Sequence, residues 1–441
     1  DRGRGVRGCR PVSPRGVGLW GPADPVHFRM LWQPSLPEPY LRMSPDDLAA
    51  AISERRRELG EALVILGHHY QTDEIIRHAD VTGDSLKLSQ TAADLAHRRG
   101  NLKYVVFCGV HFMAETADML TPDGVSVILP DLSAGCSMAD MAQYDDTVQA
   151  WEVMHAALAE RGWRGRIVPV TYVNSSAAIK AFVGDHGGAC CTSSNAASVF
   201  AWAMRGGETP HDEVKVLFLP DQHLGRNTAS AFGVDVATKS CVYDPRLARR
   251  GEELGGATPE QLEASRVVLW AGHCSVHKLF RPEHCAQVRE ADRRDGTSTT
   301  ILVHPECCKE VVDLADMSGS TEHIIRTVAG AAPGSRWAIG TEVHLVNRLA
   351  NAAAARGVHV RILSDCQCLC TTMYRIDQPH LLWVLDHLIG RFAGRGGKDG
   401  KPRVVNEIRV HAKVRESALR ALDRMLELSP GGSRATPALA D

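Results

Sequence analysis

The sequence predicts an α/β protein built from several small parallel sheets. Short, unbroken runs of apolar residues are typical of strands buried on both faces. Alanine-rich helical stretches alternate with these runs, which indicates parallel strands joined by helices. Nine runs are too many for one compact sheet, so several sheets are expected. The runs are Leu63–Leu66, Val105–Phe107, Val125–Leu129, Ile167–Val170, Val216–Leu219, Val267–Trp270, Ile301–Val303, Trp337–Ile339 and Val358–Leu363.

The first predicted helix starts after Ser44, which is a typical N-cap residue and is followed by Pro45 and two acidic residues. This first helix is expected to run to Gly60. Further helices are predicted over Ser85–His97, Asn195–Met204, Val343–Ala355 and Glu407–Leu426. We expect a disordered extension rich in Arg, Gly and Pro, three α/β domains of which the third carries the C-terminal helix, and a flexible tail. Their predicted bounds are 1–43, 44–145, 146–262, 263–428 and 429–441.

Composition limits the classes of function. The chain has 441 residues, 44% of them apolar and 23% charged, with a net charge of −2. It has no basic excess for nucleic acid, and no apolar run approaches the roughly 20 residues of a membrane span. Residues 1–20 lack the apolar segment of a secretory signal, and 13 cysteines are few for a disulfide scaffold. We therefore expect a cytoplasmic protein whose cysteines serve metal or redox chemistry.

Three of the predicted strands end in a pair of chemically capable side chains at positions i and i+2. Such positions point to the same side of an extended chain. Open α/β sheets place their ligands at the carboxyl ends of strands. Three such pairs indicate three domains that face one centre. The pairs are His68 and Tyr70, Tyr172 and Asn174, and His304 and Glu306.

Three predicted helices begin with hydroxyl residues. The segments are Asp84-Ser85, Thr192–Asn195 and Gly319–Thr321. Capping alone explains each one taken singly. Together they also suit a substrate with several carboxylates or a phosphate, because helix starts carry free N–H groups and positive dipole ends.

The cysteines do not follow the spacing of zinc or ferredoxin sites. Cys136 and Cys274 stand alone in glycine-containing loops after predicted strands, and a dense cluster follows in Asp365–Cys370. Three thiolates from three places can hold three irons of a cubane cluster and leave the fourth iron open. An open iron acts as a Lewis acid, which suits dehydration better than electron transfer.

Many segments resemble the quinolinate synthase family, over roughly residues 45–425. They include Gly67–Gln71, Gly83–Leu86, Phe112–Thr116, Gly135–Ala139, Tyr172–Ser176, Cys191–Ala196, Pro220–Gly225, Gly272–His277, His304–Cys307, Gly319–Thr321, Gly340–Glu342 and Cys370–Met373. The resemblance implies three similar α/β domains with pseudo-threefold symmetry around one [4Fe–4S] cluster. It also implies condensation of iminoaspartate with dihydroxyacetone phosphate to quinolinate, with loss of phosphate and two waters, in NAD biosynthesis from aspartate.

The resemblance also assigns residues. The implied cluster ligands are Cys136, Cys274 and Cys370. The implied substrate-binding residues are His68, Ser85, Tyr172, Asn174, Ser193, His304, Glu306 and Thr321. Glu306, Tyr70, His68 and His277 are the implied acid–base residues.

Some alternatives stay open on the sequence. Many relatives carry CxxCxxC near the last ligand, whereas this chain has CxCxC, and Cys366 and Cys368 could form a strained redox pair. Another three-cysteine hydro-lyase, an iron–sulfur sensor or electron carrier, and a structural zinc protein are the competing functions. Functional coupling to an L-aspartate oxidase is expected for the family, and neither nucleic acid nor membrane is an expected partner.

Overall fold

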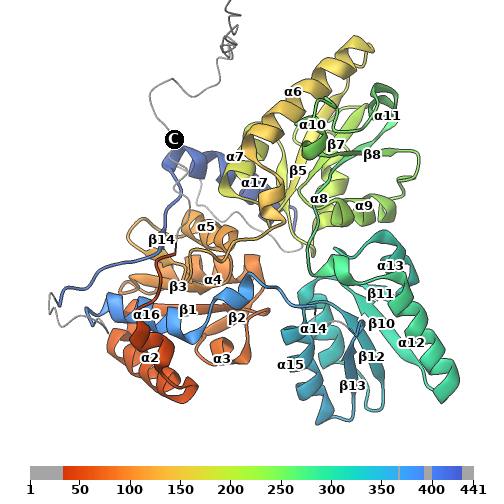
Figure 1. Ribbon diagram of the computed structural model, residues 1–441. Helices are drawn as coiled ribbons and strands as arrows, with labels where there is room; N and C mark the ends of the chain where they lie inside the picture. Colours follow the sequence, from red (N-terminus) through yellow and green to blue (C-terminus); the bar gives the residue numbers. More distant parts are fainter. Residues whose placement is uncertain (1–32, 366–367, 392–399, 430–441) are drawn as a thin grey trace, which may run out of the picture.

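The computed structural model describes residues 33–365, 368–391 and 400–429, and these form three α/β domains arranged around a common centre (Figure 1). Each domain contains one sheet, and every strand pair but one is parallel. The predicted fold class of several small parallel sheets is therefore confirmed.

The first sheet has the order β14-β4-β3-β1-β2. Its strands are β1 (Leu63–His68), β2 (Val81–Gly83), β3 (Tyr104–Cys108), β4 (Ser126–Ile128) and β14 (Glu407–Ile408). The helices of this domain are α1 (Glu38–Arg42), α2 (Pro45–Leu59), α3 (Asp73–Ile76), α4 (Ser85–Arg98), α5 (His111–Leu120) and α16 (Gln378–Leu388). Ser44 caps α2 as predicted, because its hydroxyl accepts from the N–H of Asp47 at 3.2 Å.

The second sheet has the order β6-β5-β7-β9-β8. Its strands are β5 (Arg166–Tyr172), β6 (Ala189–Cys191), β7 (Val214–Leu219), β8 (Ser240–Tyr243) and β9 (Val267–Trp270). Its helices are α6 (Tyr144–Glu160), α7 (Ala177–Asp185), α8 (Ala196–Ala203), α9 (Gln222–Ala231), α10 (Pro245–Ala248), α11 (Pro259–Ala264) and α17 (Ala412–Glu427). Helix α17 packs against α7 at Gly184, where a Cβ atom would lie 1.9 Å from the Ser417 carbonyl oxygen.

The third sheet has the order β11-β10-β12-β13. Its strands are β10 (Thr299–Val303), β11 (Met317–Ser318), β12 (Arg336–Gly340) and β13 (His359–Ile362). Its helices are α12 (Pro282–Asp295), α13 (Lys309–Leu314), α14 (Thr321–Ala329) and α15 (Val343–Ala354). Short 3₁₀ turns complete the described elements: η1 (Gly60–Ala62), η2 (Ala139–Met141), η3 (His277–Leu279) and η4 (Met373–Arg375).

Three details differ from the sequence prediction. Strand β9, which we assigned to the third domain, pairs with β7 and β8, so the second sheet extends past residue 262. The C-terminal helix begins at Ala412, not Glu407, because Glu407 and Ile408 pair with β4 and Ile408 is buried. Residues 38–42, within the predicted disordered extension, form α1, which buries Tyr40 against the first domain. Most of the predicted extension, 1–32, and the tail from 430 lie outside the described residues.

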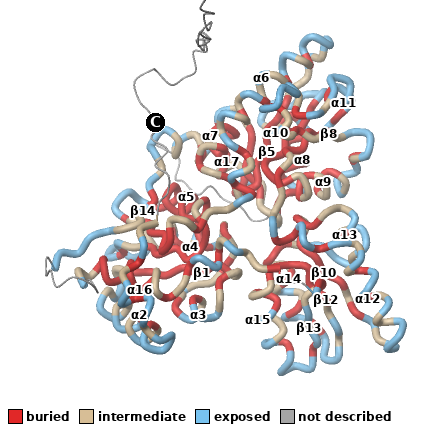
Figure 2. Tube along the Cα trace, viewed as in Figure 1, coloured by how far each residue is buried: buried red, intermediate tan, exposed pale blue. Residues whose placement is uncertain are grey.

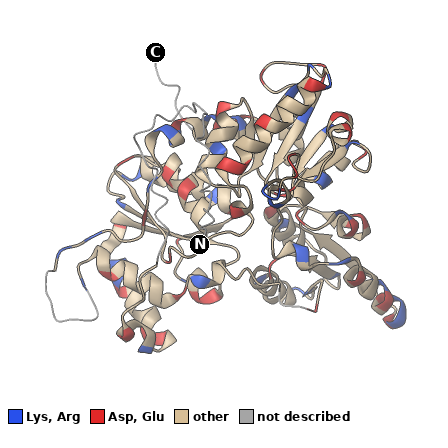
Figure 3. Ribbon diagram, turned by 45° about the horizontal axis from the view of Figure 1, so that its top comes forward, with Lys and Arg blue, Asp and Glu red and all other residues tan. Residues whose placement is uncertain are grey.

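The buried residues are concentrated in the three sheets. The buried segments lie inside each domain, and the exposed ones follow the outer helices and loops (Figure 2). Basic and acidic residues are interspersed over all three domains (Figure 3). None of the helices in the described part of the chain combines the length and apolarity that a membrane span needs.

Candidate active site

One pocket lies where the three domains meet. It contains every residue that the sequence prediction assigned to the site: His68, Tyr70, Ser85, Cys136, Tyr172, Asn174, Ser193, Cys274, His277, His304, Glu306, Thr321 and Cys370. Asp84, Phe112, Thr192, Thr372 and Met373 are among the other lining residues. No lysine or arginine of the described chain lines this pocket.

The same local hydrogen bond recurs in two of the predicted pairs at strand ends, His68 with Tyr70 and His304 with Glu306. The N–H of Tyr70 donates to His68 Nδ1 at 3.1 Å, just after β1. The N–H of Glu306 donates to His304 Nδ1 at 3.3 Å, just after β10. In each pair the ring therefore accepts at Nδ1 from residue i+2, which fixes the ring and leaves Nε2 as the donor of a neutral imidazole.

Hydroxyl groups reach the pocket from helix starts. Ser85 is the first residue of α4, and Thr321 is the first residue of α14. Ser193 lies just ahead of α8, and its side chain lowers the pKa of Tyr172 against the larger effect of burial. These hydroxyls lie near free N–H groups and positive dipole ends, so this side of the pocket suits anionic groups.

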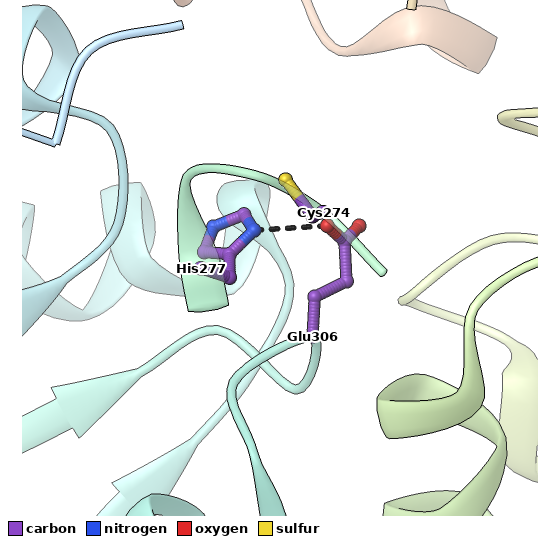
Figure 4. A group of neighbouring side chains, drawn as sticks. All are labelled: Cys274, His277 and Glu306. Atoms are coloured by element: carbon purple, nitrogen blue, oxygen red, sulfur yellow. Dashed lines mark hydrogen bonds and ion pairs between the residues drawn. The ribbon is translucent and has the colours of Figure 1, made fainter. Parts of the chain in front are cut away.

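A chain of hydrogen bonds connects Glu306 of the third domain to Tyr70 of the first. His277 Nδ1 lies 2.8 Å from Glu306 Oε2, and its Nε2 lies 3.2 Å from the Thr341 hydroxyl (Figure 4 shows the first of these bonds). The same Thr341 hydroxyl lies 3.1 Å from the Tyr70 hydroxyl. Burial raises the pKa of Tyr70 well above its usual range, so its hydroxyl keeps its proton at neutral pH.

The charge states in this chain follow from its surroundings. Burial raises the pKa of Glu306, but its interactions with His277 and His304 and the bond from Tyr172 outweigh burial and leave the pKa below its usual range. Burial lowers the pKa of His304 to about 3, so that ring is neutral at pH 7. Burial also lowers the pKa of His68. The pocket therefore holds a carboxylate beside the neutral imidazoles of His68 and His304 and the phenols of Tyr70 and Tyr172.

The three predicted ligand thiols share one local structure. Each cysteine lies after a strand (β4, β9 or β13) and three residues before a 3₁₀ turn (η2, η3 or η4). In each case the cysteine carbonyl accepts from the N–H of residue i+4, at 3.0 to 3.1 Å. In each case the backbone N–H of residue i+3 lowers the pKa of the thiol, against the larger effect of burial. The threefold repeat sets these cysteines apart from the others. They are Cys136, Cys274 and Cys370.

The thiols fit a metal centre. Burial raises the pKa of Cys136 to about 12 and also raises the pKa of Cys274 and of Cys370. A thiolate in this position needs a cation, and a bound metal deprotonates its thiol ligands. No further cysteine of the described chain lines the pocket. The described part of the pocket therefore offers three cysteine sulfurs that could serve as thiolate ligands of one metal centre.

Comparison with known proteins identifies the family. A profile described as "Quinolinate synthetase A protein" matches residues 50–427. The chain belongs to this family. A quinolinate synthase of Acidobacterium capsulatum is 49% identical over 391 residues, covering 88% of this chain and 95% of the relative. A quinolinate synthase of Bacillus velezensis is 48% identical, and the match covers 89% of this chain and 96% of the relative. A quinolinate synthase of Streptomyces coelicolor is 47% identical, and the match covers 92% of this chain and 94% of the relative.

The predicted family is thus confirmed, and the chain is an enzyme of the quinolinate synthetase A family. Family membership and the donor set both support an iron–sulfur cofactor. Cys366 lies outside the described residues, so the predicted pairing with Cys368 stays a prediction. Cys108, Cys190, Cys191 and Cys307 are buried, as expected of cysteines that pack as small apolar residues, whereas Cys308 is only half-buried.

A second possible metal site overlaps the first. Cys274, His277 and Glu306 offer ligand atoms that all lie within 4.8 Å of one another (Figure 4). However, both nitrogens of His277 already have partners, Glu306 and Thr341. A metal held by this trio would break one of these bonds. The trio is therefore better suited to moving protons than to holding a single ion.

Thr341 is a residue of the hydrogen-bond chain that the sequence prediction missed. It is fully buried and connects Tyr70 with His277 from behind the pocket wall. The sequence did contain a hint of its role. Thr341 directly follows strand β12, as predicted site residues lie at the ends of β1 and β10. A single threonine between glycine and glutamate carries little chemical information until its partners are known.

Proposed function

We propose that this enzyme condenses iminoaspartate with dihydroxyacetone phosphate to form quinolinate, phosphate and two waters, as a step of NAD biosynthesis from aspartate. The atoms balance without an external oxidant or reductant. One observation carries the proposal. In this chain of the quinolinate synthetase A family, three thiols with the same local structure line one pocket together with the hydrogen-bonded pair Glu306 and His277.

Cys136, Cys274 and Cys370 are the proposed ligands of a [4Fe–4S] cluster. When bound, such a cluster supplies a Lewis-acidic iron with an open position, which assists the loss of hydroxyl groups as water. The backbone N–H groups that lower the pKa of each thiol support this assignment, because such groups stabilise thiolates.

Glu306 is the proposed general base. Its carboxylate is ionised, buried, and oriented by His277 and Tyr172. A base held in this way can remove the proton that each enolisation and dehydration step requires. Tyr70, with its proton retained, is the proposed acid at the other end of the chain through Thr341. His68 contributes a neutral N–H donor rather than a charge.

The helix-start side of the pocket is the proposed anion site. Both substrates carry anionic groups, and the pocket has no lysine or arginine among its described lining residues. Ser85, Ser193, Thr321 and Asn174 are therefore the proposed donors to carboxylates and phosphate, assisted by helix N–H groups. His304 and Tyr172 complete the proposed substrate-binding set.

The setting follows from the chemistry. An iron–sulfur cluster with an open iron is sensitive to oxygen, so we propose a reducing, cytoplasmic location. Iminoaspartate hydrolyses readily in water. We therefore propose coupling to an L-aspartate oxidase that supplies it. Relatives named as quinolinate synthases argue against both a sensor and another three-cysteine hydro-lyase.

The test is an anaerobic preparation followed by two measurements. Iron and sulfide are counted against protein, and quinolinate is assayed from freshly generated iminoaspartate with dihydroxyacetone phosphate. We expect one [4Fe–4S] cluster per chain and quinolinate formation that requires both substrates. A cluster-containing protein that forms no quinolinate would refute the reaction, and zinc in place of iron would refute the cofactor.

A further inference from the structure

Lys180 is a buried cation directly behind the pocket wall. It lies on α7, and its side chain is fully buried. Its ammonium group donates to the Ser175 carbonyl and lies 5.5 Å from the centre of the Phe112 ring. In the described chain no carboxylate lies within ion-pair distance of it. A buried ammonium without a paired anion is costly, so its presence calls for an explanation.

Lys180 contacts the wall of the pocket on two sides. Ser175 follows Asn174, which lines the pocket, and Phe112 lines it directly. Burial lowers the pKa of Lys180, whereas Cys190, Glu115 and Cys136 raise it. One of these three groups, Cys136, is a proposed cluster ligand.

The pocket needs positive charge once it is occupied. Three thiolates carry more negative charge than an oxidised [4Fe–4S] core compensates, and Glu306 adds a carboxylate. The described lining residues include no lysine or arginine to offset them. Lys180 is a buried cation one layer behind this lining, where its ammonium group donates to the Ser175 carbonyl and lies over the Phe112 ring.

We propose that Lys180 is a positioning residue whose buried positive charge stabilises the anionic cluster on Cys136, Cys274 and Cys370 and sets its reduction potential. This inference rests on the proposed cofactor. It does not depend on the substrates. A positive charge near a cluster favours the reduced, more negative state, so removing it shifts the potential in the negative direction.

The chain offers a matched control in Lys215 on β7. It is also buried, donates only to backbone carbonyls (Glu263 and Ser265, both at 2.6 Å), and lies 5.1 Å from the centre of the Trp163 ring. Burial lowers its pKa as well. It does not line the pocket, and no proposed cluster ligand is among the groups that influence it.

The experiment compares Lys180→Met, Lys180→Gln and Lys215→Met with the wild type, as anaerobic holoenzymes. The one-electron midpoint potential is read from the EPR signal of the reduced cluster, and iron and thermal unfolding are measured on the same samples. Gln keeps an N–H donor for the Ser175 carbonyl but has no charge. At a fixed potential, we expect the reduced-to-oxidised ratio in both Lys180 variants to fall by about tenfold or more, which is about 59 mV for one electron.

The outcomes decide the inference. A negative shift in both Lys180 variants with none in Lys215→Met supports it, as does loss of iron from a folded Lys180→Gln protein while Lys215→Met keeps its iron. A wild-type potential in either Lys180 variant overturns it. An equal shift in Lys215→Met, or failure of both Lys180 variants to fold, also overturns it. A wild type that holds its cluster but makes no quinolinate refutes the proposed reaction and leaves this comparison intact.

Discussion

Replacing Thr341 by valine removes one hydroxyl and almost no volume. That hydroxyl is 3.1 Å from the Tyr70 hydroxyl and 3.2 Å from His277 Nε2. Tyr70 keeps a longer contact to Thr321 at 3.4 Å, whereas His277 Nε2 has no other partner among the described residues. The substitution therefore leaves one buried imidazole nitrogen unsatisfied, at a cost of about 1–3 kcal/mol.

The effect on kcat depends on whether the hydrogen bond between Thr341 and His277 is needed in the ground state or only in the transition state. If the bond is needed only in the transition state, a loss of about 1–3 kcal/mol lowers kcat by roughly 5- to 150-fold. We expect Thr341→Val to keep its iron and to show this fall in kcat, measured as quinolinate formation under anaerobic conditions. Thr341→Ser is the control, because it keeps the hydroxyl and loses only a methyl group. Wild-type kcat in Thr341→Val, or equal losses in both variants, would show that the chain from Glu306 to Tyr70 has no part in turnover.

Three further predictions concern the base, a ligand and stability. Glu306→Gln should keep the cluster and lower kcat by about 10²- to 10⁴-fold, and near-normal turnover would remove Glu306 as the base. Cys370→Ser should lose most of its iron while Cys308→Ser keeps it, so the reverse pattern would mean that the wrong thiol was assigned. Burial lowers the pKa of His78, whose Nε2 lies 2.9 Å from Gln378, so the unfolded chain binds the proton more readily. The free energy of unfolding should therefore fall as the pH drops below about 6.5, and His78→Gln should flatten that slope in urea titrations; an unchanged slope would contradict this assignment.

The interior of the fold was predictable because its central strands are continuous apolar runs. The five strands that the sequence prediction missed, β2, β6, β8, β11 and β14, all lie at the edge of a sheet. An edge strand is short and pairs on one side only, so it needs no long apolar run. Val81-Thr82-Gly83 and Met317-Ser318 look like loop sequence until the neighbouring strand is known.

The site was predictable to the extent that its residues follow strand ends. His68, Tyr172 and Glu306 could be found in this way, because a buried strand that ends in reactive side chains is unusual. The threefold repeat of the cysteine turns could not be found, since Gly135-Cys136-Ser137, His273-Cys274-Ser275 and Leu369-Cys370-Thr371 share little besides the cysteine. What they share is backbone geometry, which only the folded chain reveals.

The path of the chain after Cys370 has a consequence for the order of assembly. Residues beyond 376 supply α16 and the outer strand β14 to the first domain, then α17 to the second. Because the chain is synthesised from its N-terminus, the first and second domains are complete only after α16, β14 and α17 have been synthesised. The third thiol also emerges late, after all four strands of its own domain. On the proposed ligand assignment, the ligand set is complete only once Cys370 has been synthesised, after every strand of the second and third sheets, so insertion of the proposed cluster would follow the synthesis of these sheets.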